Sequence, residues 1–214
     1  MVRTRFCADL AFYHQRRWPA RPVRLLSSLY LFAASPGLWI LLAHRLSHWW
    51  VVGWSRANKA KWWLRLVSIP ISLLELLINL FTKSDILGRS NIEGGVCLSD
   101  HGYIIFGATQ MGSGTVIGAR TTIGMGLADR GLPTIGRNVW IGSDCIVYGS
   151  LTIGDGATLL PGTALTRSIP AGVVMQGNPA HLVLRNFDNM ALRIQPSLDA
   201  EQYVEKCLAT MQGN

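Results

Sequence analysis

The hydrophobic pattern in the C-terminal half of the chain repeats every six residues. Several repeats place glycine after an aliphatic residue, as in "IGARTT", "IGRNVW" and "IGDGAT". The aliphatic positions lie six apart, with one interval of twelve: Ile105, Met111, Ile117, Ile123, Ile135, Ile141, Val147, Ile153, Leu159 and Leu165. This is the hexapeptide signature of a parallel β-helix, whose coils of three short strands take about eighteen residues and stack their aliphatic side chains inside.

The first part of the chain has a different pattern, dense in Leu and Trp and without strand-like alternation. "RLLSSLYLFAASPGLWILLAHRLSHWW" and "KWWLRLVSIPISLLELLINLF" predict helices that break at Ser35-Pro36-Gly37 and kink at Pro70. Near the C-terminus, "LDAEQYVEKCLATM" predicts one short amphipathic helix. We therefore expect a mainly β protein with an α-helical, basic, Trp-rich domain over residues 1–84. A β-helix domain over 85–180 follows, and then a C-terminal tail with a short helix over 181–214.

Charge separates the same two parts. Residues 1–90 hold 13 Lys and Arg against 3 Asp and Glu, whereas residues 91–214 hold 7 against 9. Seven of the eight tryptophans also lie in the first part. A helical bundle accounts for this composition, and basic residues interleaved with Trp equally suit peripheral contact with the inner face of a membrane. No motif that reads a nucleic-acid groove is present, so we expect no nucleic-acid partner.

Cysteine and histidine spacing gives no indication of a metal site. The four cysteines are far apart, and we expect free thiols in a reducing compartment. His44 and His48 lie four apart in a predicted helix without a third ligand, so no metal is expected. The first residues lack the apolar run of a signal peptide. These features predict a cytoplasmic protein, with attachment to the inner face of the membrane as the further option.

Two features interrupt the repeats. The interval of twelve, "IGMGLADRGLPTIG", predicts a loop that leaves the coil around Asp129, Arg130 and Gly131, and insertions in solenoids gather on the binding face. Asp100 and His101 stand ahead of the regular repeats in "LSDHGYIIFG". A neutral imidazole with a pKa near ~6.5 can take the proton of a hydroxyl nucleophile. His101 is therefore a candidate general base.

Four segments carry a resemblance to a known family. "SPGLWILLAHRLSHWW", "DHGYIIFG", the hexapeptides and "GNPAHLV" occur in the same order in the serine acetyltransferase family. The chain is most similar to the relatives that acetylate exopolysaccharide, of the colanic-acid type, over residues 30–184. The resemblance implies a coil that winds left-handed and acetyl-CoA as co-substrate. It also implies a homotrimer with active sites between adjacent β-helices.

The resemblance also implies roles for individual residues. His101 matches the general base, and Asp85 matches the aspartate that orients the imidazole, although its distance from the histidine is one residue longer than in the serine enzymes. Asp100 and Arg130 match positions that bind the acceptor. Three positions match the edge that contacts the pantetheine arm of CoA: Gly124, Ser143 and Thr158.

The acceptor is predicted from two departures from the serine enzymes. Their loop pairs an arginine with a histidine, whereas here Arg130 is followed by Gly131 and Leu132. Their second aspartate has no counterpart in "RLLSSLYLFAAS". We therefore expect the acceptor to be a saccharide hydroxyl of a cell-surface polysaccharide or its lipid-linked precursor. The alternatives are serine O-acetylation in cysteine biosynthesis and a non-catalytic β-helix scaffold, which would have no need of the Asp-His pair.

Overall fold

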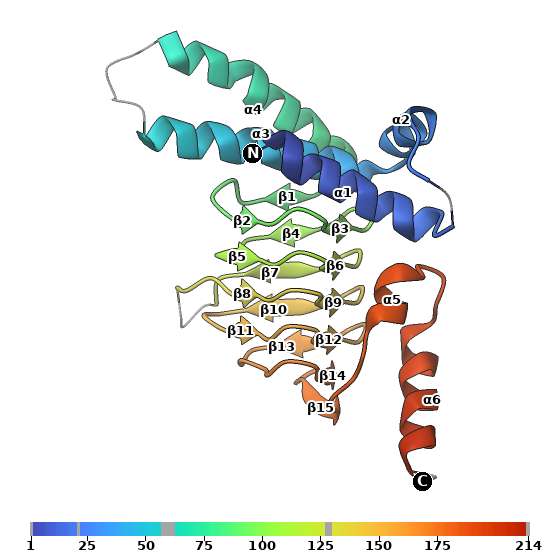
Figure 1. The fold of residues 1–214 in the computed structure, drawn as a ribbon. Helices are drawn as coiled ribbons and strands as arrows, with labels where there is room; N and C mark the ends of the chain where they lie inside the picture. The colour runs from blue at the N-terminus through green and yellow to red at the C-terminus, as the bar shows by residue number, and fades with distance from the viewer. Residues whose placement is uncertain (1, 21, 57–62, 127–129, 213–214) are drawn as a thin grey trace.

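The computed structural model describes residues 2–20, 22–56, 63–126 and 130–212. They form helices across one end of a stack of short strands, and further helices beside the stack (Figure 1). The N-terminal helices are α1 (Val2–Arg17), α2 (Leu25–Ala34), α3 (Pro36–Arg56) and α4 (Trp63–Thr82). The C-terminal helices are α5 (Met190–Ile194) and α6 (Ala200–Gln212). The break predicted at Ser35-Pro36-Gly37 is confirmed, since α2 ends at Ala34 and α3 begins at Pro36. Helix α4 continues through Pro70.

The strands form three sheets, which we name A, B and C. Sheet A holds β1 (Asp85–Ile86), β4 (Ile105–Phe106), β7 (Thr122–Gly124), β10 (Ile146–Tyr148) and β13 (Ala164–Leu165). Sheet B holds β2 (Asn91–Ile92), β5 (Gln110–Met111), β8 (Thr134–Ile135) and β11 (Thr152–Ile153). Sheet C holds β3 (Cys97–Leu98), β6 (Val116–Ile117), β9 (Trp140–Ile141), β12 (Thr158–Leu159), β14 (Val174–Gln176) and β15 (His181–Leu184).

From β1 to β13, consecutive strands enter sheets A, B and C in turn, so each strand stacks on the strand three before it. The ladders are parallel, apart from the antiparallel pair β14–β15. This arrangement confirms the parallel β-helix predicted from the six-residue period. Strand β15 extends the sheet beyond residue 180, into the segment assigned to the tail by the sequence analysis.

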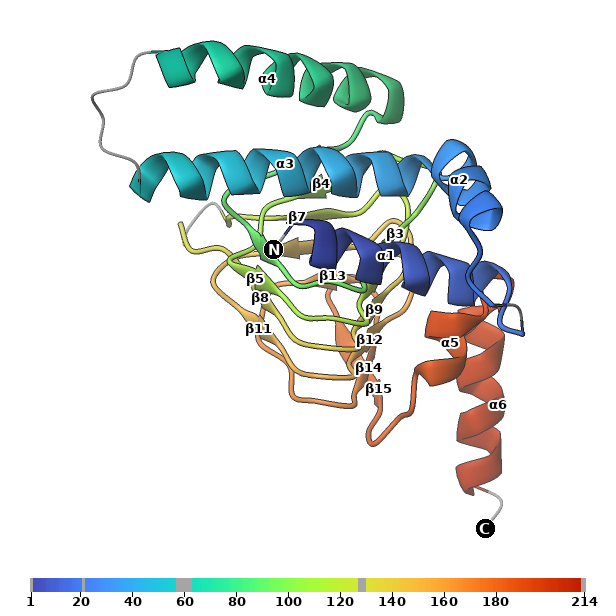
Figure 2. The ribbon, with the colours of Figure 1, turned by 45° about the horizontal axis from the view of Figure 1, so that its top comes forward.

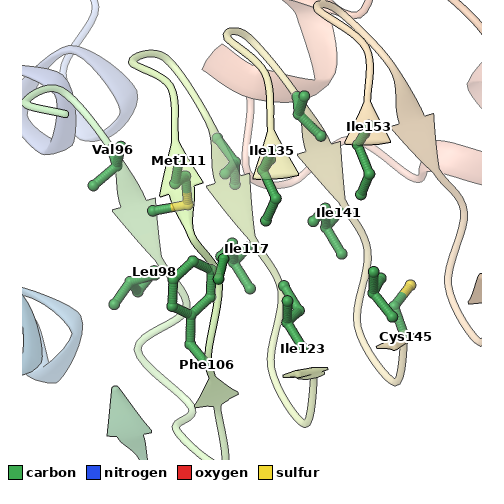
Figure 3. Packing of buried hydrophobic residues seen from close by; sticks show 14 of the residues in the cluster. Val96, Leu98, Phe106, Met111, Ile117, Ile123, Ile135, Ile141, Cys145 and Ile153 are labelled. Carbon is green, nitrogen blue, oxygen red and sulfur yellow. The ribbon is translucent and has the colours of Figure 1, made fainter. Parts of the chain in front are cut away.

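The core is a stack of inward-facing apolar side chains from the strands and corners of the coil (Figure 3). In sheet A, Ile123 pairs in register with Phe106 and with Val147. In sheets B and C the residues at the repeat positions are equally inaccessible, with Met111, Ile117, Ile135, Ile141 and Ile153 at 0–1 % exposure. The six-residue period therefore holds because one side chain per strand must point into the same closed interior.

The inward register predicted for Ile105 is wrong. Ile105 is 56 % exposed, whereas its neighbour Phe106 is 2 % exposed and fills the core. The reason is a wide corner between sheets C and A. Eight residues separate Leu98 from Phe106, rather than six, and the chain turns through positive φ values at Gly102 and Tyr103. The spacing of six holds before this corner, at Ile86, Ile92 and Leu98, and resumes after it from Met111.

The twelve-residue interval leaves the coil between β7 and β8. Pairing resumes in phase, with Met111 opposite Ile135 and Ile123 opposite Val147. The segment between these strands adds no rung to the stack, which is what the sequence predicted for the loop. Arg130 is exposed, and Asp129 lies outside the described residues.

The N-terminal helices close the first end of the β-helix. Figure 2 shows α1 and α3 across the opening coils, with α4 on the outer side of α3. A buried ion pair joins α1 to α3, with Arg45 Nη2 3.1 Å from Asp9 Oδ2. The Asp9 carboxylate also accepts the N–H groups of Gly95 and Val96, at 2.8 and 3.1 Å. The helical part is thus bonded to the backbone that leads into β3.

No individual helix in the described part of the chain is both long and apolar enough to cross a bilayer. Leu25–Ala34 and Pro36–Val51 meet the length and hydropathy requirements only when taken together, and the pair bends by 93° at its break.

The C-terminal segment packs on the outer face of sheet C. A second apolar cluster forms there: Leu160, Val174, Phe187, Leu192, Ala200 and Val204. The side-chain amide of Asn189 donates to the carbonyls of Asn138 and Gly156, at 2.8 and 3.1 Å. This segment therefore covers β12 and creates one wall of a cleft beside sheet C.

Candidate active site

A cleft of about 510 Å³ opens beside sheet C, between α1 and the C-terminal helices. Its lining comes from segments far apart in the sequence. Helix α1 contributes Arg16 and Arg17, the corner after β3 contributes Asp100 and His101, and the corner after β9 contributes Ser143. The C-terminal segment closes the opposite side with residues that include Pro196 and Asp199. Of the residues predicted from sequence, the fold therefore brings Asp100, His101 and Ser143 to one cleft.

His101 is held at the wide corner by backbone contacts with the end of α4. The next residue, Gly102, has a φ of +68°, and a Cβ atom there would lie 2.1 Å from the carbonyl oxygen of Thr82. The N–H of Tyr103 donates to the same oxygen at 3.1 Å. Only glycine fits between His101 and this contact. The corner therefore presents the exposed His101 side chain at the cleft.

Ser99 is the hydrogen-bonding neighbour of the imidazole. Its Oγ lies 3.5 Å from His101 Nδ1 and accepts the His101 backbone N–H at 3.3 Å. A contact at Nδ1 leaves Nε2 as the nitrogen available to a hydroxyl proton. Ser99 also lines the cleft, although the sequence analysis did not single it out.

The carboxylate of Asp100 faces the beginning of α3. Its Oδ1 accepts the backbone N–H of Gly37 at 3.2 Å. Asp100 keeps exposed surface, but partial burial of its carboxyl raises the pKa. The Gly37 N–H, the Ser35 hydroxyl and the positive charges of His101 and Arg16 oppose that rise. Asp100 thus adds negative charge next to His101 and also anchors the N-terminus of α3.

Asp85 lies apart from this cleft. It is an exposed residue of β1 that pairs in register with Ile105 of β4 in sheet A, and it is not part of the cleft lining. Its charge acts on Glu75 of α4, whose pKa is raised first by burial and then by Asp85. Within the described residues there is no hydrogen bond between Asp85 and His101. The orientation of the imidazole by Asp85 stays a prediction, and Ser99 holds the ring in this protomer.

The three residues predicted to contact CoA do not share one edge of the coil. Ser143 lies at the corner between sheets C and A, whereas Gly124 ends β7 at the corner between sheets A and B. Arg130 follows in the loop at that second corner. Thr158 has no exposed surface, because the C-terminal segment covers β12, so it cannot meet a cofactor in this conformation. The six extra residues of the loop between β7 and β8 shift the count, so positions about eighteen residues apart across the loop fall on different faces.

Arg16 and Arg17 are the cleft residues that sequence analysis missed. They end α1 as "QRRW", a basic helix end that looks ordinary in the sequence. Only the packing of α1 beside β3, about 80 residues later in the chain, brings the two arginines to the cleft. There the Tyr13 hydroxyl donates to the carbonyl oxygen of Leu98 at 2.7 Å.

Part of the β-helix matches a known family in sequence. The family description "Bacterial transferase hexapeptide (six repeats)" matches residues 133–167, which cover β8 through β13. Residues 133–167 therefore resemble the hexapeptide repeats of bacterial transferases. The β-helix is left-handed, as the resemblance implied, and follows an α-helical N-terminal part.

Two curated relatives differ in how much of the chain they match. A serine acetyltransferase of Synechococcus elongatus is 27% identical over 199 residues, which cover 91% of this chain and 72% of the relative. A chloramphenicol acetyltransferase of Agrobacterium fabrum is 32% identical over 69 residues. That match covers 32% of this chain, and the chain spans only 33% of that relative's length.

A solved structure extends the likeness to the fold. Serine acetyltransferase from Brucella abortus strain S19 in complex with coenzyme A superposes with a TM-score of 0.68 at 20% identity. The match covers 86% of this chain and 68% of that structure. These comparisons do not support the expected closeness to exopolysaccharide acetyltransferases, and they favour the serine alternative instead.

Proposed function

We propose that the protein transfers an acetyl group from acetyl-CoA to an alcohol hydroxyl, with His101 as general base. The observation that carries the proposal is the position of His101, exposed at the wide corner and lining the 510 Å³ cleft together with Asp100 and Ser143. The comparisons add support, because the matched relatives are acetyltransferases and one solved relative holds coenzyme A. A scaffold would not require a histidine at such a cleft.

The proposed step proceeds without a covalent enzyme intermediate. His101 Nε2 takes the proton of the acceptor hydroxyl as its oxygen bonds to the thioester carbonyl carbon. The tetrahedral intermediate then collapses with cleavage of the C–S bond, and the imidazolium returns its proton to the departing CoA thiolate. Ser99 holds Nδ1 during both transfers, and the negative charge of Asp100 favours the imidazolium.

L-Serine is the first acceptor to test. The serine acetyltransferase match extends over 91% of this chain, which supports serine over the saccharide acceptor expected from the sequence. A saccharide hydroxyl remains the second candidate because of the loop sequence, where Gly131 and Leu132 follow Arg130. The cleft lining is polar on the side of α1 and His101, which suits either kind of acceptor.

We propose that the enzyme works as a homotrimer whose subunits meet on sheet A. The outer face of this sheet exposes apolar side chains, with Ile105 at 56 %, Ile146 at 45 % and Tyr148 at 42 % exposure. Sheet A lies between the edge that carries His101 and the edge that carries Gly124 and Arg130. A second copy packed against sheet A would bring the His101 edge of one subunit toward the Gly124 and Arg130 edge of the other. Light scattering that finds an active monomer at micromolar concentration would contradict this arrangement.

Peripheral membrane contact is a separate proposal. Leu25, Leu26 and Phe81 are 77–81 % exposed at the helical end, close in sequence to the exposed basic residues Arg24 and Lys83. Apolar and basic groups together bind anionic lipid surfaces, and salt weakens the charge contribution. Sedimentation with anionic vesicles should show salt-sensitive binding. Equal recovery in the supernatant with and without vesicles would exclude it.

The decisive assay measures CoA release from acetyl-CoA with L-serine, neutral sugars and oligosaccharides as acceptors. His101→Ala should lower kcat by about 10²–10⁴ and leave acetyl-CoA binding unchanged, because only proton transfer is lost. The matched control is His181→Ala, an exposed histidine of β15 outside the cleft lining. Near-full turnover by His101→Ala, or equal losses in the two variants, would contradict the assignment.

A further inference from the structure

Two arginines at the end of α1 line the cleft without an acidic partner. Arg16 is half-buried, and its Nη1 donates to the carbonyl oxygen of Arg193 at 2.7 Å, which leaves its charge unbalanced. Arg17 is exposed and has no hydrogen bond or ion pair within the described ranges. The ion pairs found there involve other arginines: Arg45, Arg120 and Arg137. The cleft therefore contains two positive charges that are free to meet an anion.

The positive charge of Arg16 lies within electrostatic reach of β3 and of the corner after it, which carries His101. Burial raises the pKa of both Cys97 and Asp100, and the charge of Arg16 lowers each of them. On the other wall, Asp199 Oδ1 accepts the backbone N–H groups of Glu201 and Gln202 at 3.0 and 3.3 Å. That carboxylate is thus occupied at the beginning of α6, at more than ion-pair distance from either arginine.

We infer that Arg16 and Arg17 form an anion subsite for a carboxylate of the acceptor, a step that rests on the proposed function. A guanidinium binds a carboxylate through paired N–H groups, and such bonds are stronger than neutral ones. In L-serine the carboxylate carbon is three bonds from the reacting hydroxyl oxygen. The phosphates of CoA are separated from the thioester by the whole pantetheine arm. An anion subsite close to the base therefore suits the acceptor better than CoA.

The subsite is distinct from the loop arginine. Arg130 lies at the corner between sheets A and B, whereas the cleft opens beside sheet C. In this chain α1 supplies positive charge to the cleft that His101 also lines. The acceptor class is accordingly a hydroxy acid, such as serine, or a saccharide that carries a carboxylate, such as a uronic acid.

The test compares acceptor pairs that differ only in charge: L-serine against L-serinamide, and a uronic acid against its neutral hexose. Arg17→Gln is the main variant because the exposed Arg17 side chain makes no hydrogen bond or ion pair within the described residues, and Arg16→Gln is the second. Arg3→Gln is the control, an exposed arginine of α1 outside the cleft lining. Each variant is checked by thermal unfolding, and KM is measured for the acceptor and for acetyl-CoA.

We expect Arg17→Gln to raise KM for the carboxylate acceptor about tenfold, as for loss of a charge-assisted hydrogen bond. KM for the neutral partner and for acetyl-CoA should not change, and neither should any constant of Arg3→Gln. An increase confined to acetyl-CoA would mean that the arginines bind phosphate. Equal losses with charged and neutral acceptors would mean a structural role. Wild-type protein that acetylates no acceptor would instead overturn the proposed function itself.

Discussion

The wild-type protein is expected to lose much stability in mild acid because of His44, and the His44→Leu variant should not show this loss. His44 lies in α3 at 1 % exposure, and neither of its ring nitrogens has a hydrogen-bond partner among the described residues. Burial, followed by the positive charges of Arg45 and His48, lowers its pKa from 6.5 to about 3. The folded protein therefore keeps this imidazole neutral at pH values where the unfolded chain protonates it.

The sign and size of the effect follow from proton linkage. Between the unfolded pKa of 6.5 and the folded pKa of about 3, the unfolded state binds one more proton, so stability falls as the pH falls. Each pH unit in this window costs about 1.4 kcal/mol. From pH 7.5 to 5 the loss is about 2 kcal/mol, since only the part below 6.5 counts, and it approaches about 5 kcal/mol near pH 3.

The assay is urea unfolding followed by far-ultraviolet circular dichroism at a fixed protein concentration, from pH 7.5 to 5. Carboxylates titrate mainly below this range, and the difference between wild type and His44→Leu isolates the histidine. The variant should be as stable as wild type or more so at pH 7.5, because leucine leaves no unpaired polar atom in the core. Between pH 7.5 and pH 5, the free energy of unfolding of the variant should fall by about 2 kcal/mol less than that of wild type. Equal pH dependence in wild type and variant would refute the reasoning, and the exposed His181→Leu serves as control.

Three further predictions concern the fold and the corner. Phe106→Ala should lower the free energy of unfolding by about 3–5 kcal/mol, whereas Ile105→Ala should cost less than about 1 kcal/mol. Denaturant titration of both variants tests the register, and the reverse order would contradict it. Asp9→Ala and Arg45→Ala should each cost about 3–5 kcal/mol, with the double variant losing less than their sum, because each single change already leaves a buried charge unpaired. Gly102→Ala should cost about 1–3 kcal/mol or more and lower kcat, since a Cβ atom there displaces the corner. Its melting temperature and turnover should fall together, and unchanged values would show that the corner tolerates the side chain.

Much of the architecture could be predicted from the sequence because it rests on local patterns. The period of six follows from the requirement that one side chain per strand points into a closed core, and it is visible at Met111, Ile117 and Ile123 without any structure. The helix break at Ser35-Pro36 is equally local, since proline restricts the residue before it. His101 could be selected because an imidazole ahead of the repeats has a chemical use whatever its surroundings.

Other features were decided only by tertiary packing. The period assigns successive strands to successive faces, but the twelve-residue interval adds six residues without adding a strand. Ser143 and Gly124, about one coil apart in the sequence, therefore lie on different edges. The burial of Thr158 depends on a C-terminal segment that folds back over β12. The register at Phe106 depends on a wide corner whose turn is stabilised by the end of α4.

The cleft itself is the clearest case of a feature that only the tertiary structure decided. Arg16 and Arg17 line the same cleft as His101, more than 80 residues later in the sequence, because α1 packs on the first coils and hydrogen-bonds to β3. Local periodicity reports which side of an element is buried, whereas the charges that share a cavity are set by the packing of one element against another. The sequence by itself therefore determined the β-helix and its candidate base, and the packing of the helices against the coil determined the chemical surroundings of that base.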